Sequence, residues 1–256
     1  MPLLTTEAII LHSLPYGEAD KIVTLYTLEF GKMKGIAKSA RRSRKRFGNT
    51  LEICTHVLVT FFEKETLPLV RLDHCDLIQA FPGLQEDILK LAWASYFIEL
   101  VNEMTAEKIR NPELFRLIMN FLMLINRELF REEMKHIFEI RLLSLLGYEP
   151  QFRHCTRCQK VITEEKLFFG SREGGLLCLP CSANLPGLIP ISMGTVKTLQ
   201  LAQTMDMDKI GRISFSSQSL RESEAALSRF LQQYIGKDLK AKRFIEQIQN
   251  TVTGEE

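Results

Sequence analysis

Two Cys-x-x-C pairs constrain the fold of this chain more than any other feature of its sequence. The first pair is Cys155 and Cys158, the second is Cys178 and Cys181, and 19 residues separate the pairs. Each pair turns two sulfurs toward one point, so two pairs can surround one metal ion tetrahedrally. The spacing predicts one structural Zn²⁺ per chain, because four thiolates leave no coordination position open for catalysis.

The segment between the pairs predicts a hairpin, formed by residues 167–169 and 174–177, that carries the second pair as in a zinc ribbon. Two other interpretations are a redox dithiol pair and a spacing that binds no metal. His154, beside the first pair, is an alternative ligand. Cys54 and Cys75 lie in apolar segments, and we expect them to be small buried side chains.

The first 80 residues have the pattern of a small β domain. Five apolar or β-branched segments with turn residues between them predict strands at residues 8–11, 21–27, 32–38, 51–63 and 69–78. Five short strands in one segment indicate a small barrel or a sandwich. Residues 39–49 are polar and basic, and we expect a loop or a short helix there.

The periodicity becomes helical after Pro82-Gly83. Helices are predicted at residues 89–104, from Asn111-Pro112 onward, and at 131–146, 192–203, 219–234 and 240–249. The helix after Pro112 is apolar on almost all sides, so we expect it to be buried. The predicted fold class is therefore α+β, with a β-barrel at residues 1–80, a helical domain at 81–150 and 191–256, and the cysteine segment at 151–190.

The net charge of +2 conceals an uneven distribution. Residues 32–46 contain eight basic side chains and no acid, whereas residues 81–150 contain 11 acids and eight bases. A basic face on a small barrel suits nucleic acid, because phosphates supply most of the affinity. The candidate DNA-binding residues are Lys32, Lys34, Lys38, Arg41, Arg42, Arg44, Lys45 and Arg46, with a second group of Lys240, Lys242 and Arg243 beside Lys237.

Lys32, Lys34 and Lys38 are expected to share one face of a strand, because alternate residues point the same way. Phe47 is the best candidate for stacking on a base, although a place in the core is as well supported. The alternative interpretation of the whole segment is a solvated loop or an anion-binding surface for a protein partner.

The sequence contains no P-loop, G-x-S-x-G, H-E-x-x-H or G-x-G-x-x-G motif, so we expect no enzyme. The longest apolar stretch, residues 117–125, is too short for a membrane span, which needs about 20 residues. The N-terminus has no signal-peptide pattern. We therefore expect a soluble, cytoplasmic protein that contacts no membrane.

Several short motifs follow one another along nearly the whole chain. They are Ala8-Ile9-Ile10-Leu11, Tyr16-Gly17-Glu18-Ala19-Asp20-Lys21-Ile22, Thr27, Gly31-Lys32, Ala37-Lys38-Ser39-Ala40-Arg41-Arg42, Gly147-Tyr148-Glu149-Pro150, the four paired cysteines and Lys240-Ala241-Lys242-Arg243-Phe244. In this order they resemble the RecO family of bacterial recombinational DNA-repair proteins, in its zinc-bearing branch. A glycine that the family pattern has near Ser39 is missing here.

The resemblance implies an N-terminal OB-fold and a helical domain that carries the zinc ribbon. It also implies a recombination mediator that binds single- and double-stranded DNA and anneals complementary strands. Such a mediator works with RecR to load RecA onto strands coated by single-strand-binding protein, and it recognises the acidic C-terminal tail of that protein. The competing hypotheses are an RNA-binding or translation-associated module and a metal-dependent enzyme.

Overall fold

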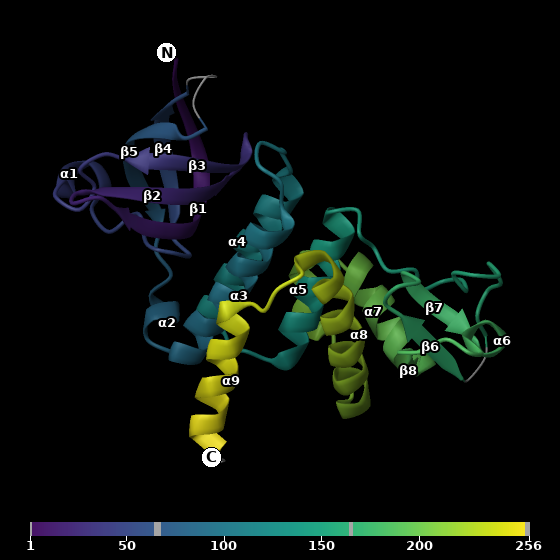
Figure 1. The fold of residues 1–256 in the computed structure, drawn as a ribbon. Coiled ribbons are helices and arrows are strands. Elements are labelled where there is room, and N and C mark those ends of the chain that lie inside the picture. Colours follow the sequence, from purple (N-terminus) through teal and green to yellow (C-terminus); the bar gives the residue numbers. More distant parts are fainter. Residues whose placement is uncertain (1, 64–67, 164–165, 254–256) are drawn as a thin grey trace. The chain divides into compact units, whose positions relative to one another are not determined.

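The protein, described here from a computed structural model, folds into two compact units (Figure 1). The structure describes residues 2–63, 68–163 and 166–253. The first unit comprises the chain up to Leu129 together with the segment that begins at Leu239. The second unit is the segment between them, Phe130–Asp238. The boundary therefore falls inside the helical part of the sequence.

The first unit contains a closed barrel of five strands, in the order β1-β2-β3-β5-β4, with β4 returning to β1. The strands are β1 (Leu3–Tyr16), β2 (Asp20–Thr27), β3 (Gly31–Ala37), β4 (His56–Phe62) and β5 (Val70–Gln79). Neighbours pair antiparallel except β3 and β5, which pair parallel. This closed five-strand sheet confirms the predicted barrel, which is of the OB type.

The predicted fourth strand was too long at its start. Residues 51–55 form a turn, and β4 begins only at His56. Cys54 lies in this turn with φ of 61°, whereas Cys75 lies on β5. Both thiols are buried, and burial raises the pKa of each to about 12. They are therefore small core side chains, as expected, although Cys54 is not on a strand.

Gly31, at the end of the turn between β2 and β3, packs against the backbone of Ile109. Its φ is +67°, and a Cβ at this position would collide with the carbonyl group of Ile109. The next residue, Lys32, donates from its ammonium group to the carbonyl oxygen of Asn102 at 2.6 Å. The turn between β2 and β3 is thus packed closely against residues 102–109, which explains why glycine stands at position 31.

The first unit also contains the short helix α1 (Arg44–Phe47) between β3 and β4, and the helices α2 (Pro82–Gln85), α3 (Ile88–Met104), α4 (Pro112–Arg127) and α9 (Lys240–Thr253). Asn111 caps α4 as predicted, because its side chain accepts from the N–H of Leu114 at 3.0 Å. Glu99 on α3 accepts from the N–H groups of Lys240 and Ala241, at 3.0 and 2.8 Å. This carboxylate holds the N-terminus of α9 against α3.

Helix α4 is less deeply buried than its sequence suggests. Its buried residues are Leu114, Phe115, Leu117, Ile118, Phe121, Leu122 and Ile125. Glu113 and Arg116 are exposed, and Met123 and Leu124 are half-buried. The helix is therefore amphipathic, and the expectation of burial on all sides was wrong because methionine and leucine also occupy its partly exposed flank.

The second unit combines helices with a small sheet. Its elements are α5 (Glu132–Leu145), β6 (Leu167–Gly170), β7 (Gly175–Cys178), α6 (Leu179–Ser182), β8 (Ile189–Ile191), α7 (Met193–Thr204), the 3₁₀ helix η1 (Met207–Arg212) and α8 (Ser217–Ile235). The sheet order is β7-β6-β8, and β6 and β7 form the predicted hairpin. The short strand β8 and η1 were not predicted. Among the described helices of both units, none is long and apolar enough to cross a membrane.

A buried ionic cluster joins α5 to α8 within the second unit. The ammonium group of Lys135 lies 3.5 Å from the carboxylate of Glu139 and also contacts that of Glu224. The Glu139 side chain is fully buried, and His136 approaches it at 3.3 Å. Burial opposes ionisation of Glu139, but Lys135 and His136 hold its pKa below the usual value. The cluster therefore depends on Lys135 to compensate a buried negative charge.

Replacing Lys135 by methionine should lower the free energy of unfolding by about 3–5 kcal/mol, because Glu139 then remains buried without its cation. Urea denaturation followed by circular dichroism measures this loss. The double variant Lys135→Met with Glu139→Gln should recover part of it, because the uncompensated charge is gone. A loss below about 1 kcal/mol in the single variant would contradict the role of the cluster.

Candidate metal centre and basic surface

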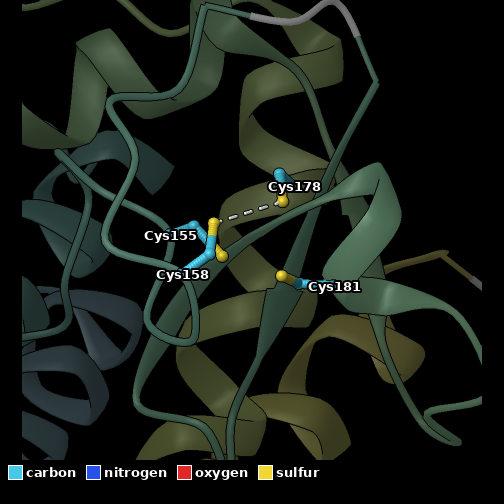
Figure 2. A group of neighbouring side chains, drawn as sticks. All are labelled: Cys155, Cys158, Cys178 and Cys181. Carbon is cyan, nitrogen blue, oxygen red and sulfur yellow. Dashed lines mark hydrogen bonds between the residues drawn. The ribbon is translucent and has the colours of Figure 1, made fainter.

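The sulfurs of Cys155, Cys158, Cys178 and Cys181 converge on one point (Figure 2). All four Sγ atoms lie within 4.8 Å of one another, and those of Cys158 and Cys178 are 3.7 Å apart. A tetrahedral ion with metal–sulfur bonds of about 2.3 Å separates its sulfurs by about 3.8 Å. A disulfide would need about 2.05 Å. The arrangement therefore fits a four-thiolate metal site.

Backbone hydrogen bonds bring the two Cys-x-x-C pairs together. The first pair sits in a turn closed by the N–H of Gln159, which donates to the carbonyl of Cys155 at 2.9 Å. The N–H of Thr156 donates to the carbonyl of Leu176 on β7 at 2.8 Å. Because β7 ends at Cys178, this bond fixes the first pair beside the second.

The thiols of the cluster differ in how readily they ionise. Burial opposes ionisation of Cys155, but N–H groups of Cys158, Cys178 and Arg157 outweigh it and lower the pKa of Cys155 to about 6. The pKa of Cys181 is raised to about 12, chiefly by the hydrogen bond with the Cys178 side chain and then by burial. Cys155 thus ionises easily, and its negative charge opposes ionisation of the neighbouring thiols. A bound cation would compensate four thiolates together, and these cysteines can therefore hold a metal ion.

The group of candidate ligands found among the described residues consists of the four paired cysteines. His154 is not part of it, and its backbone forms a bridge with Val161. Cys54 and Cys75 belong to the barrel of the first unit. Of the ligands considered from the sequence, the structure brings together only the four paired cysteines.

The basic segment after β3 is held against the turn between β1 and β2. The carboxylate of Asp20 accepts from the ammonium group of Lys38 at 2.7 Å and from the N–H of Ser39 at 2.8 Å. The hydrogen bond from Lys38 and then that from Ser39 lower the pKa of Asp20. Arg41 donates to the carbonyl of Glu18 at 3.2 Å. These bonds give the start of the segment a defined path.

We call Lys38, Arg41, Arg42, Arg44, Lys45 and Arg46 the basic loop, which includes the short helix α1 (Arg44–Phe47). Arg44 and Lys45 are exposed and form no side-chain hydrogen bond or ion pair with any residue that the structure describes. Arg42 lies 3.8 Å from Glu18, and both side chains are well exposed, so this pair is weak. The outer part of the basic loop therefore presents cations to solvent.

Lysines 32, 34 and 38 do not form the single open face that strand alternation predicts. Lys32 is buried against Asn102, and this burial lowers the pKa of its ammonium group. Lys34 is exposed and pairs with Glu107 at 2.8 Å, and Lys38 follows the end of β3. Lys32 is thus bonded within the fold, and we do not propose it as a DNA contact.

The aromatic side chains near the basic loop are mostly internal. Phe47 is 1% exposed and lies in the barrel core, with the guanidinium of Arg46 5.0 Å from its ring centroid. Burial therefore removes Phe47 as a base-stacking candidate and makes it the anchor of the loop. Tyr16 is 53% exposed and pairs across β1 and β2 with Asp20. It is an exposed aromatic side chain beside the loop.

The C-terminal candidates Lys240, Lys242 and Arg243 lie on α9 of the first unit. Lys240 and Arg243 are exposed, and Lys242 is half-buried. Phe244 beside them is 41% exposed. Lys237 precedes the boundary and belongs to the second unit.

Comparison with known proteins decides the family. A family model described as Recombination protein O N terminal matches residues 1–81, and one described as Recombination protein O C terminal matches residues 85–243. The chain belongs to the RecO family. The DNA repair protein RecO of Syntrophus aciditrophicus is 39% identical over 249 residues, which are 95% of each chain. That of Bacillus subtilis is 30% identical over 248 residues, which are 97% of this chain and 96% of the relative.

Ser39 has an unusual backbone conformation for a residue with a side chain. Its φ is +58°, in the left-handed region that favours glycine. The bond from its N–H to Asp20 needs only the backbone. Ser39 therefore keeps its hydrogen bond to Asp20 at the cost of backbone strain.

Sequence reasoning missed two carboxylates that position the candidate residues of this RecO chain. Asp20 directs the start of the basic loop, and Glu99 holds the end of α9 that carries Lys240. Asp20 lies in the motif that begins at Tyr16, and its presence in that motif was the one sign in the sequence that Asp20 has a role. No pattern along the chain marks Glu99, because its partners lie about 140 residues away.

Replacing Cys155 by serine should remove the bound metal and lower the thermal midpoint, because a site with three thiolates no longer closes. Plasma mass spectrometry should find one metal ion per chain in the parent and close to none in the variant. His154→Ala is the matched control and should keep one ion per chain. A Cys155→Ser protein with full metal content and unchanged melting would contradict a four-cysteine site.

Replacing Ser39 by glycine should raise the free energy of unfolding by about 0.5–1 kcal/mol. Relief of the left-handed strain is worth about 1–2 kcal/mol, and the added freedom of the unfolded chain costs about 0.4–1 kcal/mol. Urea denaturation measures the difference. Ser39→Ala keeps the Cβ and should show no such gain, so a glycine variant less stable than the alanine variant would rule out strain at this residue.

Proposed function

We propose that this RecO protein is a recombination mediator that binds single- and double-stranded DNA through the basic loop and anneals complementary strands. It works with RecR to load RecA onto strands coated by single-strand-binding protein, whose C-terminal tail it recognises. The observation that carries the proposal is the group of exposed cations on the barrel, of which Arg44 and Lys45 have no partner within the described part of the chain. Membership of a DNA-repair family supports it.

The proposed mechanism is electrostatic and needs no catalytic residue. Cations of the basic loop replace the counterions of phosphates, and each single-strand contact contributes about 0.7 to the slope of log affinity against log salt concentration. Four contacts give a slope of about −3. Screening of two backbones lets complementary strands approach, and base pairing then supplies the sequence information. Lys34, Lys240, Lys242 and Arg243 are proposed as secondary contacts.

We propose Zn²⁺ as the metal, because four thiolates at tetrahedral spacing are the ligand set that it prefers in structural sites. Its role is to hold the two Cys-x-x-C pairs together, in a segment whose strands are only three or four residues long. The four cysteines leave no ligand position for a substrate, which supports a mediator rather than a metal-dependent enzyme. Reduced thiols also agree with the proposed cytoplasmic location.

Reversing four charges of the basic loop, with Arg41→Glu, Arg42→Glu, Arg44→Glu and Lys45→Glu, should weaken binding of single-stranded DNA more than tenfold at moderate salt. The log–log slope should become shallower by about 3, because four phosphate contacts are lost. Fluorescence anisotropy with labelled oligothymidine across a salt series measures both quantities. Annealing of strands coated by single-strand-binding protein should fall in parallel.

The matched control reverses four exposed cations elsewhere, with Arg116→Glu, Arg127→Glu, Arg212→Glu and Arg221→Glu, at the same change in net charge. It should retain a larger share of the parent affinity and slope. Equal losses in both variants would show that only net charge matters and would contradict the proposed loop contact. Strong preference for RNA over a matched DNA strand, without DNA annealing, would favour the alternative RNA-binding module.

A further inference from the structure

The second unit contains a groove of about 680 Å³ between residues 149–153 and helix α7. This volume is in the range of about 300–1,000 Å³ that small-ligand sites in proteins occupy. Arg153 and Lys197 line the groove, are both exposed, and form no ion pair with any residue described. Glu149 is the single acid among the lining residues, so cations predominate.

A buried amide also lines this groove. The Nε2 atom of Gln203 on α7 is inaccessible to solvent and has no hydrogen-bond partner within the described residues. The neighbouring Gln200 differs, because its amide donates to the carbonyl of Phe152 at 2.9 Å. A buried N–H donor without an acceptor is costly, so the chain leaves one polar group unsatisfied in this wall of the groove.

An exposed pair of tyrosines includes the residue that directly precedes the groove in the chain. Tyr148 directly precedes its first lining residue, and its ring lies 4.4 Å from that of Tyr234, with 37° between the planes. The two residues are 40% and 43% exposed. Tyr234 also packs on the buried ring of Phe230 at 5.3 Å, and the N–H of Tyr148 is bonded to the carbonyl of Leu143. The pair is therefore fixed in place although it faces solvent.

We propose that the tyrosine pair and the groove form a second binding site for single-stranded DNA. Bases stack on Tyr148 and Tyr234, and the adjoining phosphates contact Arg153 and Lys197. Exposed aromatic rings beside unpaired cations are the combination that single-strand binding uses, because every base has a stacking face and every nucleotide a phosphate.

This inference rests on the proposed DNA-binding function and assigns it a second location. It favours a nucleic acid strand over an extended peptide, because the groove is lined by cations and the exposed rings offer stacking faces, whereas a peptide would need apolar pockets. Leu201 is the exposed apolar side chain among the residues that line the groove. Peptide binding is the alternative outcome that the test below separates.

The test uses a double variant of the full chain that carries both Tyr148→Ala and Tyr234→Ala. Its binding is compared with that of the parent protein. Binding of oligothymidine should weaken about tenfold, because loss of stacking on one base weakens binding by about fivefold or more. The slope against salt concentration should stay unchanged, since no phosphate contact is lost. Binding of an abasic strand of the same length should be equal in both proteins, because it has no bases to stack.

Tyr148→Phe with Tyr234→Phe is the matched control, and it should bind oligothymidine like the parent because the rings remain. Thermal melting of all three proteins identifies any loss of folding. Unchanged oligothymidine affinity in the folded alanine variant would overturn the second site, and so would an equal loss on the abasic strand. Failure of the proposed function is distinguishable, because it leaves the charge-reversed basic loop with the parent's affinity and salt slope.

Discussion

Closure of the barrel by parallel pairing of β3 and β5 is the constraint on which the first unit depends. Three residue pairs make this junction, with Gly35 opposite Val70, and a Cβ at Gly35 would lie 2.6 Å from the side chain of Leu72. The close approach leaves no free edge in the ring of strands. The chain that follows β3 must leave the barrel at this junction, and there the basic loop begins. Phe47 then returns to the core, so the loop is anchored at both ends.

The basic loop therefore has a defined shape before any ligand arrives. Asp20 uses one carboxylate to fix Lys38 and the backbone of Ser39, and Arg44 and Lys45 further along the loop are exposed. Pre-organised cations lose less conformational freedom on binding than a flexible basic tail does. The second unit is stabilised differently, because its small sheet is joined to four converging cysteines. A metal ion held by these cysteines would couple its binding to the folding of the small sheet, whereas the barrel is held by its apolar core.

Local patterns predicted most of the architecture and the cysteine cluster. Alternating apolar residues located the strands, Asn111 with Pro112 located the start of α4, and cysteine spacing identified the four candidate ligands that converge. Lys32 could not be placed in this way, because its exposure depends on residues about 70 positions away that pack over β3. The contact between Glu99 and the start of α9 could not be predicted either, because the two lie about 140 residues apart in the chain. Strand alternation tells which residues share a face, but not what covers it.

The central claim is that DNA meets this RecO protein at the basic loop of the barrel. Hydrogen–deuterium exchange of the full chain, with and without saturating oligothymidine, tests it without any substitution. The account predicts slower exchange of backbone amides in residues 38–48 when DNA is bound. Unchanged exchange in that segment, with protection confined to other parts of the chain, would contradict the claim.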